Sequence, residues 1–123
     1  MIRIFLLLLS ALACPSTHAQ SPTVAPKAEY AIILRLAPHY QADSVWTDAD
    51  KAAVGEHFAA LQKLQKEGKL AFAGRTTNAA SLGIIVLKNM TKAEAGAVMK
   101  ADKAIQRGIM LAELQPFHTA LKE

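Results

Sequence analysis

Cysteine is almost absent from this 123-residue sequence, which contains only Cys14, close to the amino terminus. A single cysteine excludes an internal disulfide and any metal site built from several thiolates. The six glycines form no phosphate-binding loop. Neither the paired-histidine spacing of a metal site nor the Gly-x-Ser-x-Gly turn of serine hydrolases occurs. We therefore expect no cofactor and no metal site.

Charges of one sign are not gathered in any segment. The 14 basic and 10 acidic residues give a net charge of +4, and they are interspersed in stretches such as KLQKEGK, TKAEAG and KADKAIQR. A nucleic-acid-binding surface needs clustered cations with aromatic side chains between them. We expect no nucleic-acid partner.

The long hydrophobic run of the sequence lies at its start. A basic tip with Arg3 precedes IFLLLLSALA, and the small and polar residues CPSTHAQS follow. This layout is typical of a secretory signal peptide, and the run is shorter than the about 20 apolar residues that a membrane-spanning helix needs. We expect cleavage to remove residues 1–19, leaving a periplasmic or secreted protein without a stable membrane span. The alternative is that Cys14 is a lipidation site.

The rest of the chain is long enough for one domain. Residues 20–28, rich in Pro, Ala and Ser, are predicted to be a flexible linker, and residues 29–123 to form the domain. Hydrophobic periodicity and capping residues predict a strand, a helix, a hairpin of two strands, a second helix and a last strand. The expected ranges are 30–37, 48–67, 69–75, 81–88, 91–102 and 108–116.

This order of elements is typical of an α+β, ferredoxin-like βαββαβ domain, with a four-stranded antiparallel sheet and two helices on one face. In the strand segments AIILRL and GIIVLK, apolar residues occupy positions of both parities. The sheet face away from the helices is then also apolar and must be covered. We predict a homodimer in which two copies pack sheet to sheet.

His57 lies on an apolar stripe of the first predicted helix. Val54, Phe58, Leu61 and Leu64 have helical spacing, and the imidazole falls on the same stripe. Such a histidine is either a core residue whose ring nitrogens are satisfied or an acid/base group, which needs a carboxylate to orient it.

Asp102 is the candidate carboxylate. It lies at the predicted C-terminus of the second helix, where the helix dipole disfavours a negative charge. Two helices lying side by side on the sheet would bring it toward His57. The alternative is a solvated residue at a helix end.

Two arginines and three rings complete the set of candidates. Arg75 and Arg35 are candidate ligand-binding residues for an anionic compound, and the alternative for Arg75 is a strand-end position in solvent. His39, Tyr40 and Trp46 lie in the long first loop. They are predicted to anchor that loop, with lining of a pocket mouth as the alternative.

The run EHFAALQKLQKEGKLAFAG, a hairpin, a second helix and the run KADKAIQRGIMLAELQPF resemble the YciI-like (YCII-related) family over essentially the whole mature domain. The resemblance implies a ferredoxin-like fold that dimerises into an α+β barrel. It also implies an active site built on a histidine of the first helix and an aspartate after the second, which match His57 and Asp102. A few relatives act as lyases or dehalogenating enzymes on ring compounds. Relatives usually have Asp-Pro where this chain has Asp102-Lys103, and Gly-Pro where it has Gly74-Arg75.

Together, the residues and the resemblance predict an exported enzyme. It would use His57 and Asp102 for acid/base chemistry of lyase or isomerase type on a small organic compound. The alternative is a non-catalytic small-ligand-binding or interaction module with the same fold.

Overall fold

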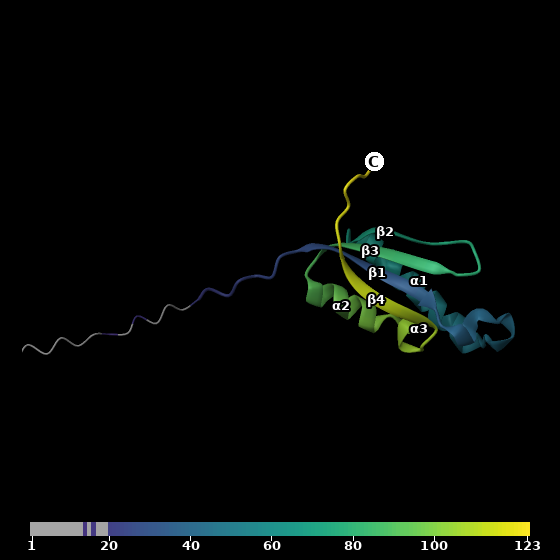
Figure 1. Cartoon of the computed structure of the whole chain (residues 1–123). Helices are drawn as coiled ribbons and strands as arrows, with labels where there is room; N and C mark the ends of the chain where they lie inside the picture. Colours follow the sequence, from purple (N-terminus) through teal and green to yellow (C-terminus); the bar gives the residue numbers. More distant parts are fainter. Residues whose placement is uncertain (1–13, 15, 17–19) are drawn as a thin grey trace, which may run out of the picture.

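The computed structural model describes residues 14, 16 and 20–123 (Figure 1). Most of the predicted signal peptide, including its cleavage site, lies outside these residues. Residues 20–27 lead into the domain as chain without helix or strand. Within the described part, no helix is both long and apolar enough to cross a membrane.

Four strands form one antiparallel sheet. They are β1 (Ala28–Leu36), β2 (Leu70–Arg75), β3 (Leu82–Met90) and β4 (Met110–Phe117), in the spatial order β2-β3-β1-β4. The first and last strands of the chain, β1 and β4, pair with each other, as in the split βαβ arrangement. The predicted α+β, ferredoxin-like fold is therefore confirmed.

The helices cover one face of this sheet (Figure 1). They are α1 (Asp48–Lys66), α2 (Lys92–Ala101) and a short α3 (Lys103–Gln106). Side chains from all three helices pack on a single core cluster that contains Ile32 of β1 and Leu87 of β3. The prediction of two helices was incomplete, because α3 follows α2 directly. The predicted first loop also contains two 3-10 turns, η1 (Pro38–Gln41) and η2 (Asp43–Val45).

Capping residues determine where the long helices begin and end. Thr47 caps α1 and Thr91 caps α2, and in each case an acidic residue three positions later, Asp50 or Glu94, completes a capping box. Gly68 follows α1 with a φ of +70°, a left-handed conformation that favours glycine at a helix end. These boundaries were readable from the sequence because they depend on local hydrogen bonds.

The buried stripe of α1 differs from the predicted one. Phe58 was expected in the core but is 60% exposed. The residues that α1 buries are Asp50, Ala53, His57 and Leu61. Helix α1 turns Asp50 and His57 inward because both contact side chains of the α3 segment. This segment comprises α3 and the capping residues at its two ends, Asp102 and Arg107. His57 on the inward face is confirmed, but its neighbours along the stripe are not all apolar.

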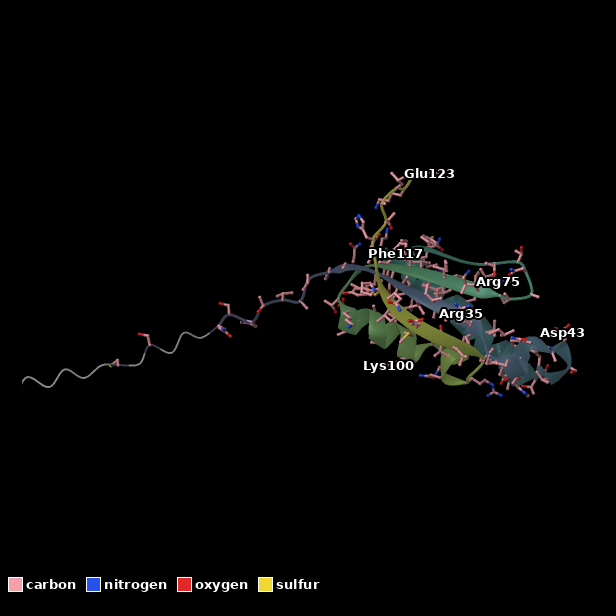
Figure 2. All side chains as sticks on the ribbon, viewed as in Figure 1. Arg35, Asp43, Arg75, Lys100, Phe117 and Glu123 are labelled. Carbon is pink, nitrogen blue, oxygen red and sulfur yellow. The ribbon has the colours of Figure 1, made fainter. Side chains whose placement is uncertain are left out.

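The face of the sheet away from the helices is also partly apolar. The cross-strand pair of Ala31 and Val86 on this face is already buried, at 1% and 0% exposure. The apolar side chains that are only partly covered there include Ile33, Ile84 and Leu111, the last of which is 54% exposed. Phe117, at the end of β4, is a large apolar residue with substantial exposure (Figure 2). The homodimer remains a prediction, and this face is the surface on which it depends.

Two substitutions on α1 test the observed helix orientation. Leu61→Ala is expected to lower the free energy of unfolding by about 2–4 kcal/mol, because Leu61 is only 9% exposed and its loss leaves a cavity. Phe58→Ala should cost less than about 1 kcal/mol, since most of that ring is already in solvent. Urea unfolding monitored by circular dichroism measures both values, and a larger loss for Phe58→Ala would contradict this helix orientation.

Candidate active site

His57 and Asp102 form a close contact between α1 and the α3 segment, 45 residues apart in the chain. The Nδ1 atom of His57 lies 2.5 Å from Oδ2 of Asp102, and both residues are 8% exposed. An ionised carboxylate only accepts hydrogen bonds, so Nδ1 carries the hydrogen and donates it. In the neutral imidazole, Nε2 is then the unprotonated nitrogen.

Asp102 has a second role that the sequence did not predict. Its Oδ1 accepts hydrogen bonds from the backbone N–H groups of Ala104 at 2.9 Å and Ile105 at 3.2 Å, which makes it the N-cap of α3. Asp102 does lie at the C-terminal end of α2, as expected, but α3 begins at the same residue, and the N-terminus of α3 favours the negative charge. Its carboxylate is therefore fixed through both oxygens.

The electrostatics of Asp102 favour the ionised form. Burial raises the pKa of its carboxyl group, but the hydrogen bond and charge of His57 and the N–H groups of Ile105 and Ala104 lower the pKa by more. The net pKa is below its usual value. Asp102 is thus a carboxylate at neutral pH, as a residue that orients an imidazole must be.

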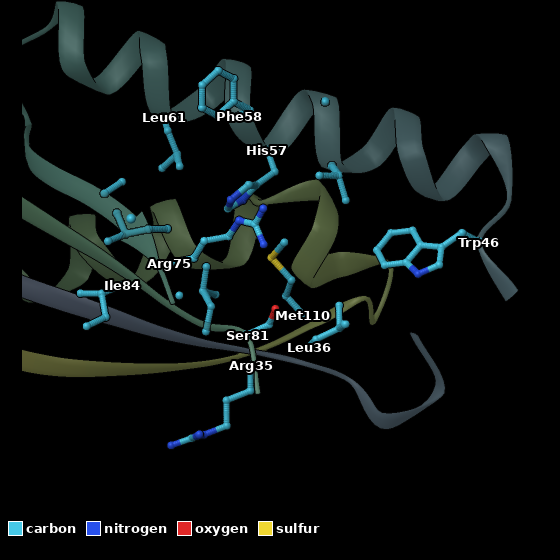
Figure 3. A pocket seen from close by; sticks show the side chains of 17 residues that line it. Arg35, Leu36, Trp46, His57, Phe58, Leu61, Arg75, Ser81, Ile84 and Met110 are labelled. Carbon is cyan, nitrogen blue, oxygen red and sulfur yellow. The ribbon is translucent and has the colours of Figure 1, made fainter. Parts of the chain in front are cut away.

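A cavity of about 610 Å³ lies between α1 and the sheet, with His57 in its wall (Figure 3). Among the described residues, Nε2 of His57 has no hydrogen-bond partner, and no buried side-chain nitrogen or oxygen there lacks one. Nε2 must therefore be accessible from the cavity. Most of the wall is apolar, including Leu34, Leu36, Trp46, Val54, Leu61 and Met110.

The structure separates the two candidate arginines. Arg75, the last residue of β2, extends from the sheet toward α1 and His57, whereas Arg35 extends away from them (Figure 3). Both border the cavity, but Arg35 pairs with Leu82 on the outer face of the sheet. Within the described part of the chain, neither arginine has an ion-pair partner. The structure brings Arg75 together with His57 and does not bring Arg35 there.

The floor of the cavity beneath Arg75 is open because of Gly83. In the register of the sheet, Gly83 lies between Leu34 and Arg75 on the helix-facing side. A Cβ atom at this position would lie 3.1 Å from the Cβ of Leu34, closer than ordinary contact. A bulge between Leu70 and Phe72 lets Leu70 pack against the core on the same face of the sheet as Arg75.

Sequence reasoning missed a second polar contact between α1 and the α3 segment. Asp50 is only 3% exposed, and its Oδ1 accepts a hydrogen bond from Arg107 at 2.6 Å. The hydroxyl of Tyr40 donates to the same oxygen at 3.3 Å, and Trp46 donates through Nε1 to the Tyr40 carbonyl. Tyr40 and Trp46 therefore anchor the first loop, as predicted, while Trp46 also lines the cavity.

Among the described residues, no group of three or more His, Cys, Asp or Glu side chains is arranged to hold a metal ion. His39 is exposed and stacks edge-on against Tyr40. The geometry instead matches an acid/base site, with one oriented imidazole, one accessible cation and apolar walls.

Comparison with known proteins identifies the family. The model of the YCII-related domain matches residues 28–117, and the chain belongs to this family. No curated protein sequence matches the chain significantly. Among solved structures, the chain is similar to 5-chloro-2-hydroxyhydroquinone dehydrochlorinase (TftG) from Burkholderia phenoliruptrix AC1100, in complex with 2,5-dihydroxybenzoquinone. That similarity has 12% identity and a TM-score of 0.49, and covers 73% of this chain and 93% of that chain.

The departure from Asp-Pro at Asp102-Lys103 has a structural explanation. Lys103 is the first residue of α3, a position where the backbone N–H needs no partner inside the helix and where proline is therefore favoured. Lysine fits the same position, and Asp102 still caps the helix. The substitution leaves the contact with His57 in place.

The ionised state of Asp102 predicts an effect on acid stability. Because its folded-state pKa lies below the unfolded value of about 3.9, its stabilisation is complete above that pH and is lost as pH falls through the lower folded-state pKa. Asp102→Asn should therefore cost about 1–3 kcal/mol of unfolding free energy at pH 5, and the difference from the wild type should shrink toward pH 2. Urea unfolding across this range measures it.

The matched control is Asp43→Asn, an exposed aspartate with no side-chain partner among the described residues. It should change stability little at either pH. A cost of Asp102→Asn that stays constant from pH 5 to pH 2 would contradict the ionised assignment.

Proposed function

We propose that the protein is an enzyme that moves a proton on a small organic compound, with His57 as the acid/base group and Asp102 as its orienting carboxylate. The observation that carries this proposal is the 2.5 Å contact from Nδ1 of His57 to Asp102, which leaves Nε2 accessible from the cavity. A carboxylate that holds one ring nitrogen fixes the tautomer in which the other is a base.

The chemistry that fits is proton transfer of isomerase or lyase type. Nε2 of His57 takes a proton from a C–H or O–H group of the substrate, and the resulting imidazolium is stabilised by the negative charge of Asp102. In an isomerisation, the same proton returns to a different atom of the substrate. In an elimination, the electron pair left by the proton forms a double bond as a leaving group departs with its own electron pair.

Arg75 is proposed to bind an anionic group of the substrate. It borders the same cavity as His57 and, within the part that the structure describes, no carboxylate neutralises it. Arg75 is exposed, as its alternative of a strand-end position in solvent predicted, but its guanidinium borders a largely apolar cavity and can bind a carboxylate there through charge-assisted hydrogen bonds. Arg35 is not included, because its side chain extends away from His57 (Figure 3).

The second candidate function is a non-catalytic binding module that uses the same cavity. The predominantly apolar walls favour it, because such walls bind a small organic ligand without any proton transfer.

We also propose that the protein is exported to the periplasm or beyond, on the basis of its signal-like N-terminus, and that it forms a homodimer through the outer sheet face. Sedimentation at micromolar concentration tests the dimer, and a stable monomer would contradict it.

The variant His57→Gln separates the enzyme from the binding module. Trp46 is the only tryptophan and lines the cavity, so its fluorescence reports binding of compounds from a panel of small cyclic acids and lactones. For a compound that the wild type converts, His57→Gln should reduce turnover by about 100-fold or more while binding remains. Unchanged turnover in His57→Gln would eliminate the catalytic assignment.

Substitution of the two arginines tests the anion site. Arg75→Gln should weaken binding of a carboxylate-bearing ligand by about 10- to 100-fold, the value of a charge-assisted hydrogen bond. Arg35→Gln removes the same charge from the other side of the sheet and is the matched control, with an expected change of less than about twofold. Equal losses of affinity in the two variants, measured by Trp46 fluorescence, would show that the overall positive charge of the protein attracts the ligand and that Arg75 forms no specific anion site.

A further inference from the structure

The α3 segment that carries Asp102 is too short to hold its own position. It contains four helical residues, Lys103–Gln106, and an isolated helix of that length is unstable in water. Its orientation must come from the elements around it. The structure shows polar contacts to α1 at both of its ends, through Asp102 before it and Arg107 after it.

The contact at the second end is a well-defined ion pair. Nε of Arg107 donates to Oδ1 of Asp50 at 2.6 Å, while Oδ2 of Asp50 accepts from the backbone N–H of Thr47 at 2.9 Å and from its hydroxyl at 2.8 Å. The hydrogen bond from Arg107, with those from Thr47, holds the pKa of Asp50 well below its usual range. Asp50 is therefore a buried, charged residue that fixes Arg107 against the start of α1.

The two polar contacts lie on the same face of α1. Asp50 and His57 are seven residues apart on α1, so they lie on the same face, two turns or about 10 Å from each other. Between them, the small side chain of Ala53 packs in one cluster with Ala104 of α3, and both are buried. Small residues at this crossing let the two helices approach closely.

The polarity of the two contacts is reciprocal. On α1 the acceptor is Asp50 and the donor is His57, whereas on the α3 segment the acceptor is Asp102 and the donor is Arg107. If the α3 segment were reversed against α1, carboxylate would meet carboxylate and imidazole would meet guanidinium. Two carboxylates that meet in a buried position are costly, and two hydrogen-bond donors that face each other leave both unsatisfied. Only one placement of the segment satisfies all four side chains.

We infer that Asp50 and Arg107 are positioning residues for the proposed site: their ion pair sets the placement of α3 in which Asp102 meets Nδ1 of His57. Asp50 also accepts a hydrogen bond from the Tyr40 hydroxyl, and the Tyr40 backbone carbonyl accepts one from Trp46 in the cavity wall. The carboxylate of Asp50 therefore contacts both the loop of the cavity wall and the α3 segment that carries Asp102. The inference rests on the proposed function of His57 and Asp102, but its test does not require a substrate.

The test is protection of the Nδ1–H hydrogen of His57 in Arg107→Gln. In the wild-type protein, this hydrogen is expected to give a downfield proton resonance with slow solvent exchange, because it is buried in a short hydrogen bond. Loss of the Arg107–Asp50 pair should accelerate that exchange by about tenfold, since α3 then separates from α1 more often. Arg107→Lys, which keeps the charge, should recover part of the protection.

The matched control is Lys100→Gln, which removes a positive charge on α2, two residues before Asp102, where the side chain is exposed (Figure 2). Its exchange rate should equal that of the wild type. If Arg107→Gln does not fold, Asp50→Asn decides the question, because its amide oxygen can still accept from the Thr47 N–H in the capping box while the charge is lost. The same tenfold acceleration is expected there.

The outcomes distinguish this inference from the proposed function. Lower thermal stability with unchanged Nδ1–H exchange in Arg107→Gln or Asp50→Asn would show a merely structural pair and overturn the inference alone. A wild-type protein with no protected Nδ1–H would contradict the His57–Asp102 pair itself, and with it the proposed function.

Discussion

The hydrogen bond between His57 and Asp102 is the interaction on which the interpretation of this structure depends. It joins the middle of α1 to the junction between α2 and α3, and both partners are nearly buried. A buried imidazole or carboxylate without a partner would be destabilising. The fold therefore keeps α1 and α3 at one distance, and that distance also defines the wall of the cavity in which Nε2 is accessible.

Much of the fold could be predicted from the sequence because its signals are local. The caps at Thr47 and Thr91, the glycine after α1 and the short apolar runs of the strands predicted the elements and their order. The inward orientation of His57 followed from its spacing to Leu61. The resemblance to YCII-related proteins supplied the pairing of His57 with Asp102, which local patterns alone left open.

What could not be predicted depends on contacts between distant segments. The helix α3 is a single turn without a periodic pattern of its own, so Asp102 was assigned to the end of α2 and its capping role was missed. The burial of Asp50 depends on Arg107, 57 residues away, and no local signal identifies that partner. The exposure of Phe58 follows from the same contacts, because they rotate α1 toward its polar residues.

The two faces of the sheet differ: the face toward the helices borders the cavity, and the outer face is partly apolar. On the helix side, Gly83 leaves space beneath Arg75. On the outer side, Leu111 and Phe117 are 54% and 38% exposed, an apolar surface that the proposed homodimer would cover. A substrate site on one face and an assembly surface on the other are compatible with a sheet whose strands are apolar at both parities.

The most direct test of the central claim is a long-range ¹H–¹⁵N correlation spectrum of the His57 ring, recorded at a pH where the imidazole is neutral. The structure predicts that Nδ1 carries the hydrogen and that Nε2 gives the ¹⁵N shift of an unprotonated, pyridine-type nitrogen, because Asp102 only accepts hydrogen bonds. A neutral ring protonated at Nε2 would contradict the account, since the nitrogen accessible from the cavity could then not act as a base.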